Sequence, residues 1–224
     1  MDLIKIIDSA IVPSPTNELL LDLVITIPKG SYIEHMYIIN SKDVTTEGDL
    51  TDNNFDIVTG LLDAGLCESV EDFHSQAFDK ISSTSDGYDT YRFKHLTWLN
   101  NNGDSDAGII IKDDMVFVTL QIDTSTEAKY KANCSESKIT IPVYNRTRML
   151  VDIANLGRLI GGCDPCRDIP ESFVKTIMEF RAFETAIEIK DWLLVKRLYN
   201  DIYNTSISKS SISYSLTHKC NCNV

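Results

Sequence analysis

Residues 113–123, DDMVFVTLQID, carry the clearest strand pattern in the chain. Aliphatic residues occupy every second position from Val116 to Ile122, and the positions between them hold Phe117 followed by polar residues. Since successive side chains of a strand point to opposite faces, this alternation predicts a strand with one buried face and one mixed face. Such a strand is typical of an antiparallel sheet that is covered on one side.

Other stretches extend this β pattern over the first two-thirds of the chain. An alternating run at 19–27 is followed by a turn at 28–30 and a strand-like run at 31–41, and we expect the two runs to pair as a hairpin. Shorter candidate strands lie at residues 3–12, 88–99, 108–111 and 137–144. Residues 1–144 are therefore predicted to form an antiparallel β-sandwich or partial barrel. Apolar spacings of three and four predict an irregular or helical insertion near residues 50–86, whose second helical segment opens with Ser69 as its cap.

After Tyr144 the apolar spacing changes to three and four, which predicts a helical unit over residues 145–204. Asn145 and Asp168 are the expected caps of its first two helices, and a third begins near Asp191. Only a short link separates the last two helices, so we expect an antiparallel helical hairpin, alone or within a three-helix unit. The Ser-rich residues 205–224 predict an extended C-terminal arm or a disordered tail. The fold class is thus α+β.

The composition indicates a globular protein and argues against nucleic-acid binding. Hydrophobic residues make up 43% of the chain and charged residues 24%. The formal net charge is -12, and no cluster of Lys and Arg offsets it. Because nucleic-acid binding depends on cations that neutralise phosphates, sequence-specific DNA binding is not expected. An acidic surface does suit a protein that lies close to DNA without retaining it.

The N-terminal segment lacks the basic start and long apolar core of a signal peptide. No apolar run reaches the roughly 18 residues that predict a membrane span. We therefore expect a soluble protein made in a reducing cytoplasm, where structural disulfides are rare.

Four of the cysteines form two close pairs, Cys163 with Cys166 and Cys220 with Cys222. Four thiolates are a tetrahedral ligand set for Zn²⁺, so these residues are candidate ligands of a structural zinc site. The Cys-x-Cys spacing is tight and the pairs lie far apart in the sequence, which leaves unligated thiols as the alternative. A redox site is disfavoured because an amphipathic helix, rather than a βαβ-type strand, precedes Cys163.

The sequence contains no catalytic signature. His35, His74 and His95 are scattered, and His218 alone lies near another candidate ligand, Cys220. A site needs convergent partners, so the first three are expected to be partly buried or surface side chains. Nucleophile-elbow, Walker, dinucleotide-binding and zinc-protease motifs are absent from the sequence. We therefore predict a protein that is not an enzyme. The one candidate cofactor is the structural zinc ion described above.

The segment from the strand at 113–123 to the predicted hairpin resembles the tail ring proteins of crAss-like bacteriophages. In that family a strand leads through a cysteine-containing loop into a helix pair with an aromatic and aliphatic core. The matching residues are Phe117 and Val118 in the strand, Cys163 and Cys166 in the loop, and Phe173, Ile177, Phe180, Arg181, Ala182, Phe183 and Glu184 in the helix. The stretches PSPTNELLLDL and IPKGSYIE also resemble the family's opening strands, and KCNCNV resembles its cysteine-bearing end.

The resemblance implies a structural virion protein of a phage tail, made in the host cytoplasm. Its copies would form a homo-oligomeric ring in the portal-to-tail stack, in contact with portal and other tail proteins, around the channel that DNA crosses. Two other classes remain open from the residues alone. One is a cytoplasmic adaptor that binds a partner through the helical hairpin, and the other is a zinc-containing enzyme using the four paired cysteines.

Overall fold

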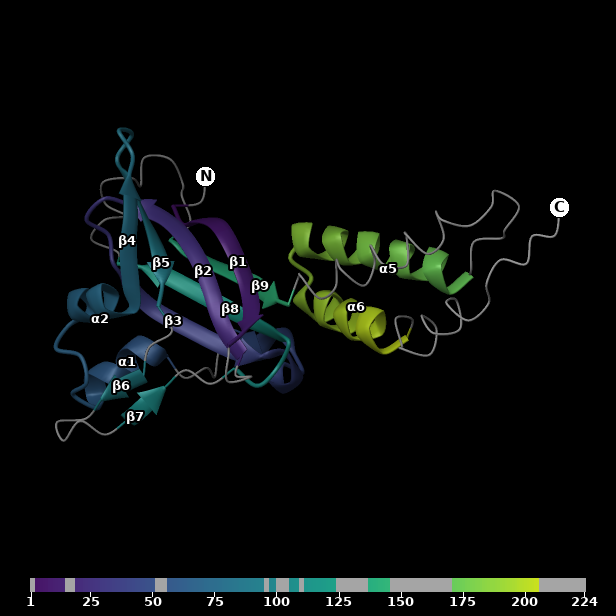
Figure 1. Cartoon of the computed structure of the whole chain (residues 1–224), viewed down its shortest axis with the longest axis horizontal. Helices are drawn as coiled ribbons and strands as arrows, with labels where there is room; N and C mark the ends of the chain where they lie inside the picture. Colours follow the sequence, from purple (N-terminus) through teal and green to yellow (C-terminus); the bar gives the residue numbers. More distant parts are fainter. Residues whose placement is uncertain are drawn as a thin grey trace. The chain divides into compact units, whose positions relative to one another are not determined.

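The computed structural model describes residues 3–14, 19–50, 56–94, 97–99, 105–108, 111–123, 137–145 and 171–205 of the 224-residue chain. The chain divides into two compact units, residues 1–145 and residues 146–224. Figure 1 shows that the first unit holds the strands and two short helices, whereas the second holds a pair of longer helices.

A four-stranded sheet with the order β1-β2-β5-β4 forms one layer of the first unit. Its antiparallel strands are β1 (Lys5–Pro13), β2 (Leu19–Pro28), β4 (Phe78–Ser83) and β5 (Tyr88–Phe93). Both edge strands are bulged, because the register shifts between Ile6 and Asp8 in β1 and between Lys80 and Ser82 in β4. A bulge places one extra residue in a strand and bends it, so the two edges do not continue the regular ladder.

The second layer is a three-stranded antiparallel sheet with the order β3-β8-β9 (Figure 1). Its strands are β3 (Ile33–Asn40), β8 (Met115–Ile122) and β9 (Lys138–Tyr144), and a separate pair is formed by β6 (Thr97–Leu99) and β7 (Ser105–Gly108). The two larger sheets face each other as in a sandwich and do not close into a barrel. Together with the helices, this arrangement confirms the predicted α+β fold class.

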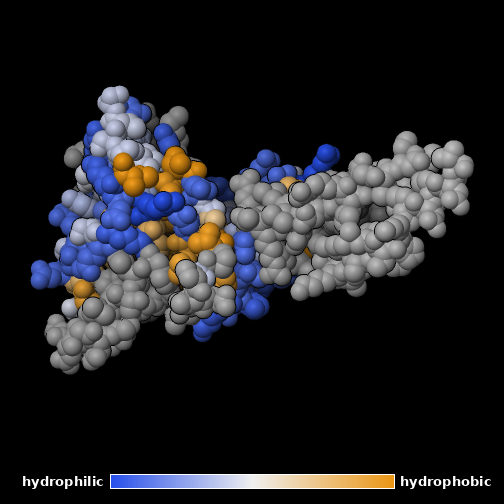
Figure 2. All heavy atoms as spheres, viewed as in Figure 1, coloured by the Kyte–Doolittle hydropathy of each residue, from blue (hydrophilic) through white to orange (hydrophobic). Residues whose placement is uncertain are grey.

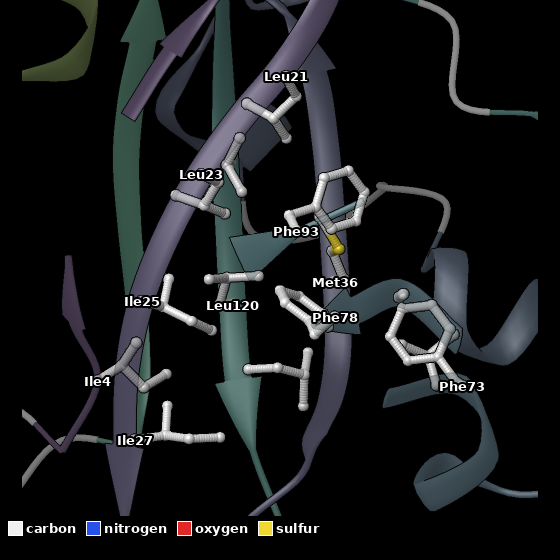
Figure 3. Packing of buried hydrophobic residues seen from close by; sticks show 14 of the residues in the cluster. Ile4, Leu21, Leu23, Ile25, Ile27, Met36, Phe73, Phe78, Phe93 and Leu120 are labelled. Atoms are coloured by element: carbon white, nitrogen blue, oxygen red, sulfur yellow. The ribbon is translucent and has the colours of Figure 1, made fainter. Parts of the chain in front are cut away.

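Side chains from both sheets meet in one hydrophobic core. Figure 3 shows the aliphatic side chains of β2, from Leu21 to Ile27, pointing toward Leu120 of β8 and Met36 of β3. Leu21, which is the most exposed of these β2 residues on the core side, is only 3% exposed. The period-two pattern of β2 therefore places one full face in the core, where removal of apolar surface from water is the main stabilising term.

Strand β8 is more buried than predicted, because both of its faces carry buried side chains. Val116, Val118 and Leu120 belong to the core, but Phe117 and Thr119 on the opposite face are also 0% exposed. Thr119 and Thr140 of β9 share a hydrogen bond of 2.8 Å between their Oγ1 atoms. The predicted mixed face is therefore present, with Gln121 and Asp123 half-buried, but it is more buried at Phe117 and Thr119 than the alternation of residue types indicates.

The predicted hairpin between 19–27 and 31–41 was also wrong. The turn forms as expected, with Gly30 at φ 79° and Ser31 N–H donating to the Pro28 carbonyl at 3.0 Å. The chain then leaves its sheet, since β2 pairs with β1 and β5 whereas β3 pairs with β8. Both strands direct apolar side chains into the same core, so they face each other across it rather than lying edge to edge.

The region near 50–86 contains helices, as predicted, and then a strand. Helices α1 (Ile57–Asp63) and α2 (Val70–Ala77) follow two 3₁₀ turns, η1 (Ser41–Asp43) and η2 (Glu47–Leu50). Ser69 caps α2 by accepting the Asp72 N–H at 3.1 Å, in agreement with the predicted Ser cap. Strand β4 begins at Phe78, directly after α2, and was missed because its remaining residues are polar or exposed.

In the second unit, α5 (Glu171–Glu188) and α6 (Trp192–Thr205) form the predicted helical hairpin. Phe183 and Ala186 of α5 are buried together with Val195, Tyr199 and Ile202 of α6. The rings of Phe183 and Tyr199 lie 6.2 Å apart between centroids. Apolar contacts between the two helices therefore hold the hairpin together.

The link between α5 and α6 is a Schellman motif, a left-handed helix end closed by two backbone hydrogen bonds. Asp191 N–H donates to the Ala186 carbonyl, Lys190 N–H donates to the Ile187 carbonyl, and Lys190 has φ 59°. Asp191 then accepts the Leu194 N–H at 3.0 Å and caps α6, as the sequence indicated. The predicted helix after Asn145 and the C-terminal arm lie outside the described residues.

Candidate functional site

The predicted zinc ligands, Cys163, Cys166, Cys220 and Cys222, lie outside the described residues, as does His218. Among the residues that the structure describes, no three His, Cys, Asp or Glu side chains form a group that could hold a metal ion. Cys67 is buried in the core of the first unit. The zinc site therefore stays a prediction from the cysteine spacing.

His74 of α2 is the most unusual titratable side chain in the described part of the first unit. It is only 3% exposed and lies in an aromatic cluster, with its ring 4.6 Å from Tyr91, 5.2 Å from Phe78 and 5.6 Å from Tyr32 between centroids. Nδ1 accepts the Ile33 N–H at 3.3 Å, which fixes the remaining proton of the neutral ring on Nε2. The cluster thus joins α2 to β3, β4 and β5.

Burial lowers the pKa of His74 to about 4, and the nearby Asp123 carboxylate only partly opposes this effect. A histidine that stays neutral at pH 7 does not supply a proton as a general acid under ordinary conditions. Nε2 is enclosed and makes no hydrogen bond. These properties identify His74 as a core residue that links elements, rather than as a catalytic group.

A second polar group lies on the hairpin formed by β4 and β5. Asp89 is 4% exposed and accepts hydrogen bonds from Lys80 Nζ at 2.6 Å and from Ser83 Oγ at 2.7 Å. Burial raises the pKa of Asp89, but the Lys80 and Ser83 hydrogen bonds outweigh it, so the net pKa is lowered. The carboxylate is thereby held ionised by two partners from its own hairpin, which is a structural arrangement.

Asp56 forms the densest set of hydrogen bonds around one described side chain. Its Oδ1 accepts the N–H groups of Met36 at 3.0 Å and Val58 at 3.2 Å, and its Oδ2 lies 2.6 Å from both His35 Nδ1 and Thr59 Oγ1. Burial raises the Asp56 pKa, but these hydrogen bonds, with His35 the strongest, lower it overall. Asp56 caps α1 and at the same time fastens that helix to β3.

The His35–Asp56 pair has the geometry of an orienting carboxylate and a base, yet its described surroundings do not form a catalytic site. The His35 ring is stacked on Tyr37, and Nε2 lies 4.0 Å from a Glu34 carboxylate oxygen. Within the described ranges no serine, threonine or cysteine is hydrogen-bonded to His35 Nε2. A triad-like site needs such a nucleophile. The pair therefore has a structural role, which is to link α1 to β3.

Several large apolar side chains on the described surface are exposed and do not pack into either hydrophobic core. Ile7 is 61% exposed and Ile81 56% exposed, and each is the extra residue of an edge bulge in the four-stranded sheet. In the second unit Met178 is 67% exposed and Ile189 64% exposed. Figure 2 shows small hydrophobic groups separated by hydrophilic side chains on the visible face of the first unit.

No protein-family model matches this chain, and the comparison with curated proteins gives no match either. None of the helices that the structure describes is long and apolar enough to cross a membrane. The functional argument therefore rests on the surfaces and the contacts described above.

Sequence inspection missed the buried acids and the exposed isoleucines for different reasons. Asp56 did carry a local signal, since it precedes an apolar helical segment and aspartate is a preferred cap. Asp89 and Asp113 are each 4% exposed, and their partners come from the facing strand of the same hairpin for Asp89 and from the distant Lys42 for Asp113. Ile7 follows Ile6 between Lys5 and Asp8, and the bulge that exposes it is set by pairing with β2.

Proposed function

We propose that this chain is a structural subunit of a phage tail, which forms a ring in the portal-to-tail stack around the DNA channel. The observation that carries the proposal is the helical hairpin, whose described part leaves Met178 and Ile189 more than half exposed while it buries Phe183. Exposed apolar side chains are the residues that a partner would cover where they belong to one contact surface, and the proposed ring gives Met178 and Ile189 this role. The resemblance to crAss-like phage ring proteins covers this same helix pair.

The β-sandwich suits the same role because its described buried carboxylates form hydrogen bonds within the sandwich and stabilise it. Asp56, Asp89 and Asp113 each accept hydrogen bonds from other elements or from their own hairpin. A ring subunit needs a stable body with separate contact surfaces at its sides and layers. The net charge of -12 favours a wall along which DNA passes without being retained.

The first test is the mass of the full chain under native conditions, alone and with the portal and tail proteins encoded beside it. We expect a large cyclic oligomer, or oligomers that form strictly with those partners. A well-behaved monomer that never joins tail components would contradict the proposal. A monomer or dimer that binds some other protein would favour an adaptor, and zinc together with substrate turnover would favour an enzyme.

The zinc hypothesis has its own test, because the ring proposal does not depend on it. If Cys163, Cys166, Cys220 and Cys222 bind zinc, the metal pins the C-terminal segment to the residues just before α5. Cys222→Ser should then lower both the zinc content and the melting temperature of the full chain, whereas Cys67→Ser, at a site outside the four thiols, should leave the zinc content unchanged. Zinc-free wild-type protein with an unaltered melting temperature in Cys222→Ser would refute the site.

A further inference from the structure

Helix α5 has an outward face that lies opposite its contact with α6. Phe183 and Ala186 are buried, whereas Arg181, Glu184 and Glu188 are exposed. Their spacing of three and four residues puts these exposed positions on adjacent rows of one helix side. The apolar members of this side are Met178, 67% exposed, and Ile189, 64% exposed, which borders the helix end. The outward face of α5 thus combines two carboxylates, one guanidinium and exposed apolar surface.

Helix α6 has a narrower outward face formed by Leu193, Arg197 and Asn200. These residues follow each other at intervals of four and three, and all three are exposed. The opposite side of the helix buries Val195 and Tyr199. Leu193 is 37% exposed, so the α6 face has an apolar end and a basic centre.

The charges on the two faces are complementary. The α5 face carries Glu184 and Glu188 against Arg181, a net negative charge, whereas the α6 face carries Arg197 alone. Within the described residues neither glutamate is paired with Arg197, and the two faces of one hairpin point away from each other across the α5–α6 contact. A second copy of the chain would supply each face with the opposite charge and with apolar surface.

We propose that the outward face of α5 in one copy binds the outward face of α6 in the next copy, so that hairpins alternate as α5-α6-α5-α6 around an assembly. This inference rests on the proposed ring and identifies the surfaces that join its neighbours. Ile189 lies near Leu193 of the adjacent copy, Arg197 lies between Glu184 and Glu188, and Met178, about 16 Å from Ile189 along α5, lies further along the same contact.

The positions of the faces favour a head-to-tail ring over a two-fold dimer. A two-fold contact uses the same patch on both partners, whereas here two different patches must meet. Because they lie on opposite sides of the hairpin, a closed dimer cannot bury both at once. With 18 residues in α5 and 14 in α6, the helices are about 27 Å and 21 Å long at 1.5 Å per residue, which gives a contact running along most of the hairpin.

Charge exchange tests the pairing directly in the full-length chain. Arg197→Glu puts like charges against Glu184 and Glu188, and the double variant Glu184→Lys/Glu188→Lys puts like charges against Arg197. Each should weaken assembly on the order of tenfold or more, measured as the concentration at which the oligomer dissociates in sedimentation velocity and native mass spectrometry. The triple variant, which reverses both faces, should recover most of the loss.

Mixing the two defective variants gives a second readout. In an alternating arrangement each reversed face meets its complement, so the mixture should assemble although each variant alone does not. Glu71→Lys, at an exposed position of α2, is the matched control for a charge reversal, and it should assemble as the wild type does. Circular dichroism confirms that all variants keep their helices, since exposed charge changes alter helix stability by only a few tenths of a kcal/mol.

The outcomes separate this inference from the proposed function. A wild-type ring that both reversals leave intact overturns the α5–α6 contact while the ring itself stands. Reversals that weaken the ring without rescue in the triple variant or the mixture also overturn the pairing. A wild-type chain that remains monomeric with all tail components overturns both proposals.

Discussion

The β-sandwich and the helical hairpin stabilise themselves by different means. The sandwich encloses its core between two sheets and two helices, and buried carboxylates such as Asp56 tie its helices to its strands. The described hairpin relies on one apolar seam around Phe183 and Tyr199, and it leaves Met178 and Ile189 exposed. The difference shows that the described sandwich buries most of its large apolar side chains within one chain, whereas the described hairpin leaves Met178 and Ile189 available for the proposed contact with a neighbouring copy.

The largest effect is expected from removing one buried aromatic side chain in each unit, which tests whether the two units differ in how they are stabilised. Phe73 of α2 and Phe183 of α5 are both helical and fully buried. We expect Phe73→Ala to destabilise the sandwich by about 3 to 5 kcal/mol, and Phe183→Ala to destabilise the hairpin by less, because two packed helices can close a cavity more easily than two sheets held by their hydrogen bonds. Hydrogen exchange followed by mass spectrometry, with urea titration, reports each unit separately. Equal losses in the two units would contradict the contrast.

A change of pH should act on the sandwich through His74. The unfolded chain protonates this ring near 6.5, whereas the folded sandwich keeps it neutral down to about 4. The unfolded state therefore binds more protons between these values, so stability falls as the pH drops through this window and stays low below it. At about 1.4 kcal/mol per pH unit the full loss is about 3 kcal/mol.

His74→Phe serves as the control because it keeps an aromatic ring in the cluster but does not titrate. Urea titrations of both proteins from pH 7 to pH 4 should show a steeper decline in the wild type than in the variant. Parallel declines would show that other groups, and not His74, cause the acid sensitivity. Exchange rates in residues 178–202 should follow the same course in both proteins.

Removal of Asp56 tests whether a side chain fastens α1 to β3. Asp56→Ala removes the helix cap and leaves the Met36 and Val58 N–H groups without their acceptor, at a cost of about 2 kcal/mol. Asp56→Asn keeps an oxygen acceptor and should cost less than half as much. Thermal melts of the two variants at pH 7 distinguish these outcomes. A similar loss in both would mean that the negative charge matters more than the acceptor geometry.

The smallest expected effect concerns one motif that occurs in both units. Helices α1 and α5 end in the same left-handed geometry, with Gly65 at φ 68° in the first and Lys190 at φ 59° in the second. Lys190→Gly should stabilise the hairpin by about 1 kcal/mol, and Gly65→Ala should destabilise the sandwich by a similar amount. Since an added Cβ at Gly65 meets nothing within 4 Å, that cost comes from the backbone alone. A neutral result for both changes in thermal melts would show that neither backbone is strained.

Strong periodicity explains which parts of the fold could be predicted from sequence. The patterns of β2 and β8 and the spacing in α5 and α6 reflect contacts between elements that are long enough to repeat. β4 could not be found this way, because it is an edge strand in which only Phe78 is buried. The pairing of β3 with β8 was equally hidden, since a turn specifies its own geometry and not which sheet the chain enters next.

The functional surfaces were less predictable than the fold. A buried acid such as Asp89 has the same local sequence as an exposed one, and only the folded chain shows which partners neutralise it. The outward faces of α5 and α6 depend on which side of each helix the other covers. Those sides follow from packing around Phe183 and Val195. Periodicity shows that each helix has an apolar face, but it does not show which other positions stay exposed in the hairpin.

The bulges at Ile7 and Ile81 have a consequence for the protein before it assembles. A regular, exposed sheet edge offers a template for strand addition, and such edges promote aggregation. Here the extra residue in β1 and the extra residue in β4 interrupt the hydrogen-bonding register at both edges of the same sheet. These bulges therefore oppose strand addition at both edges of the four-stranded sheet, which lowers the tendency of separate copies to join through that sheet.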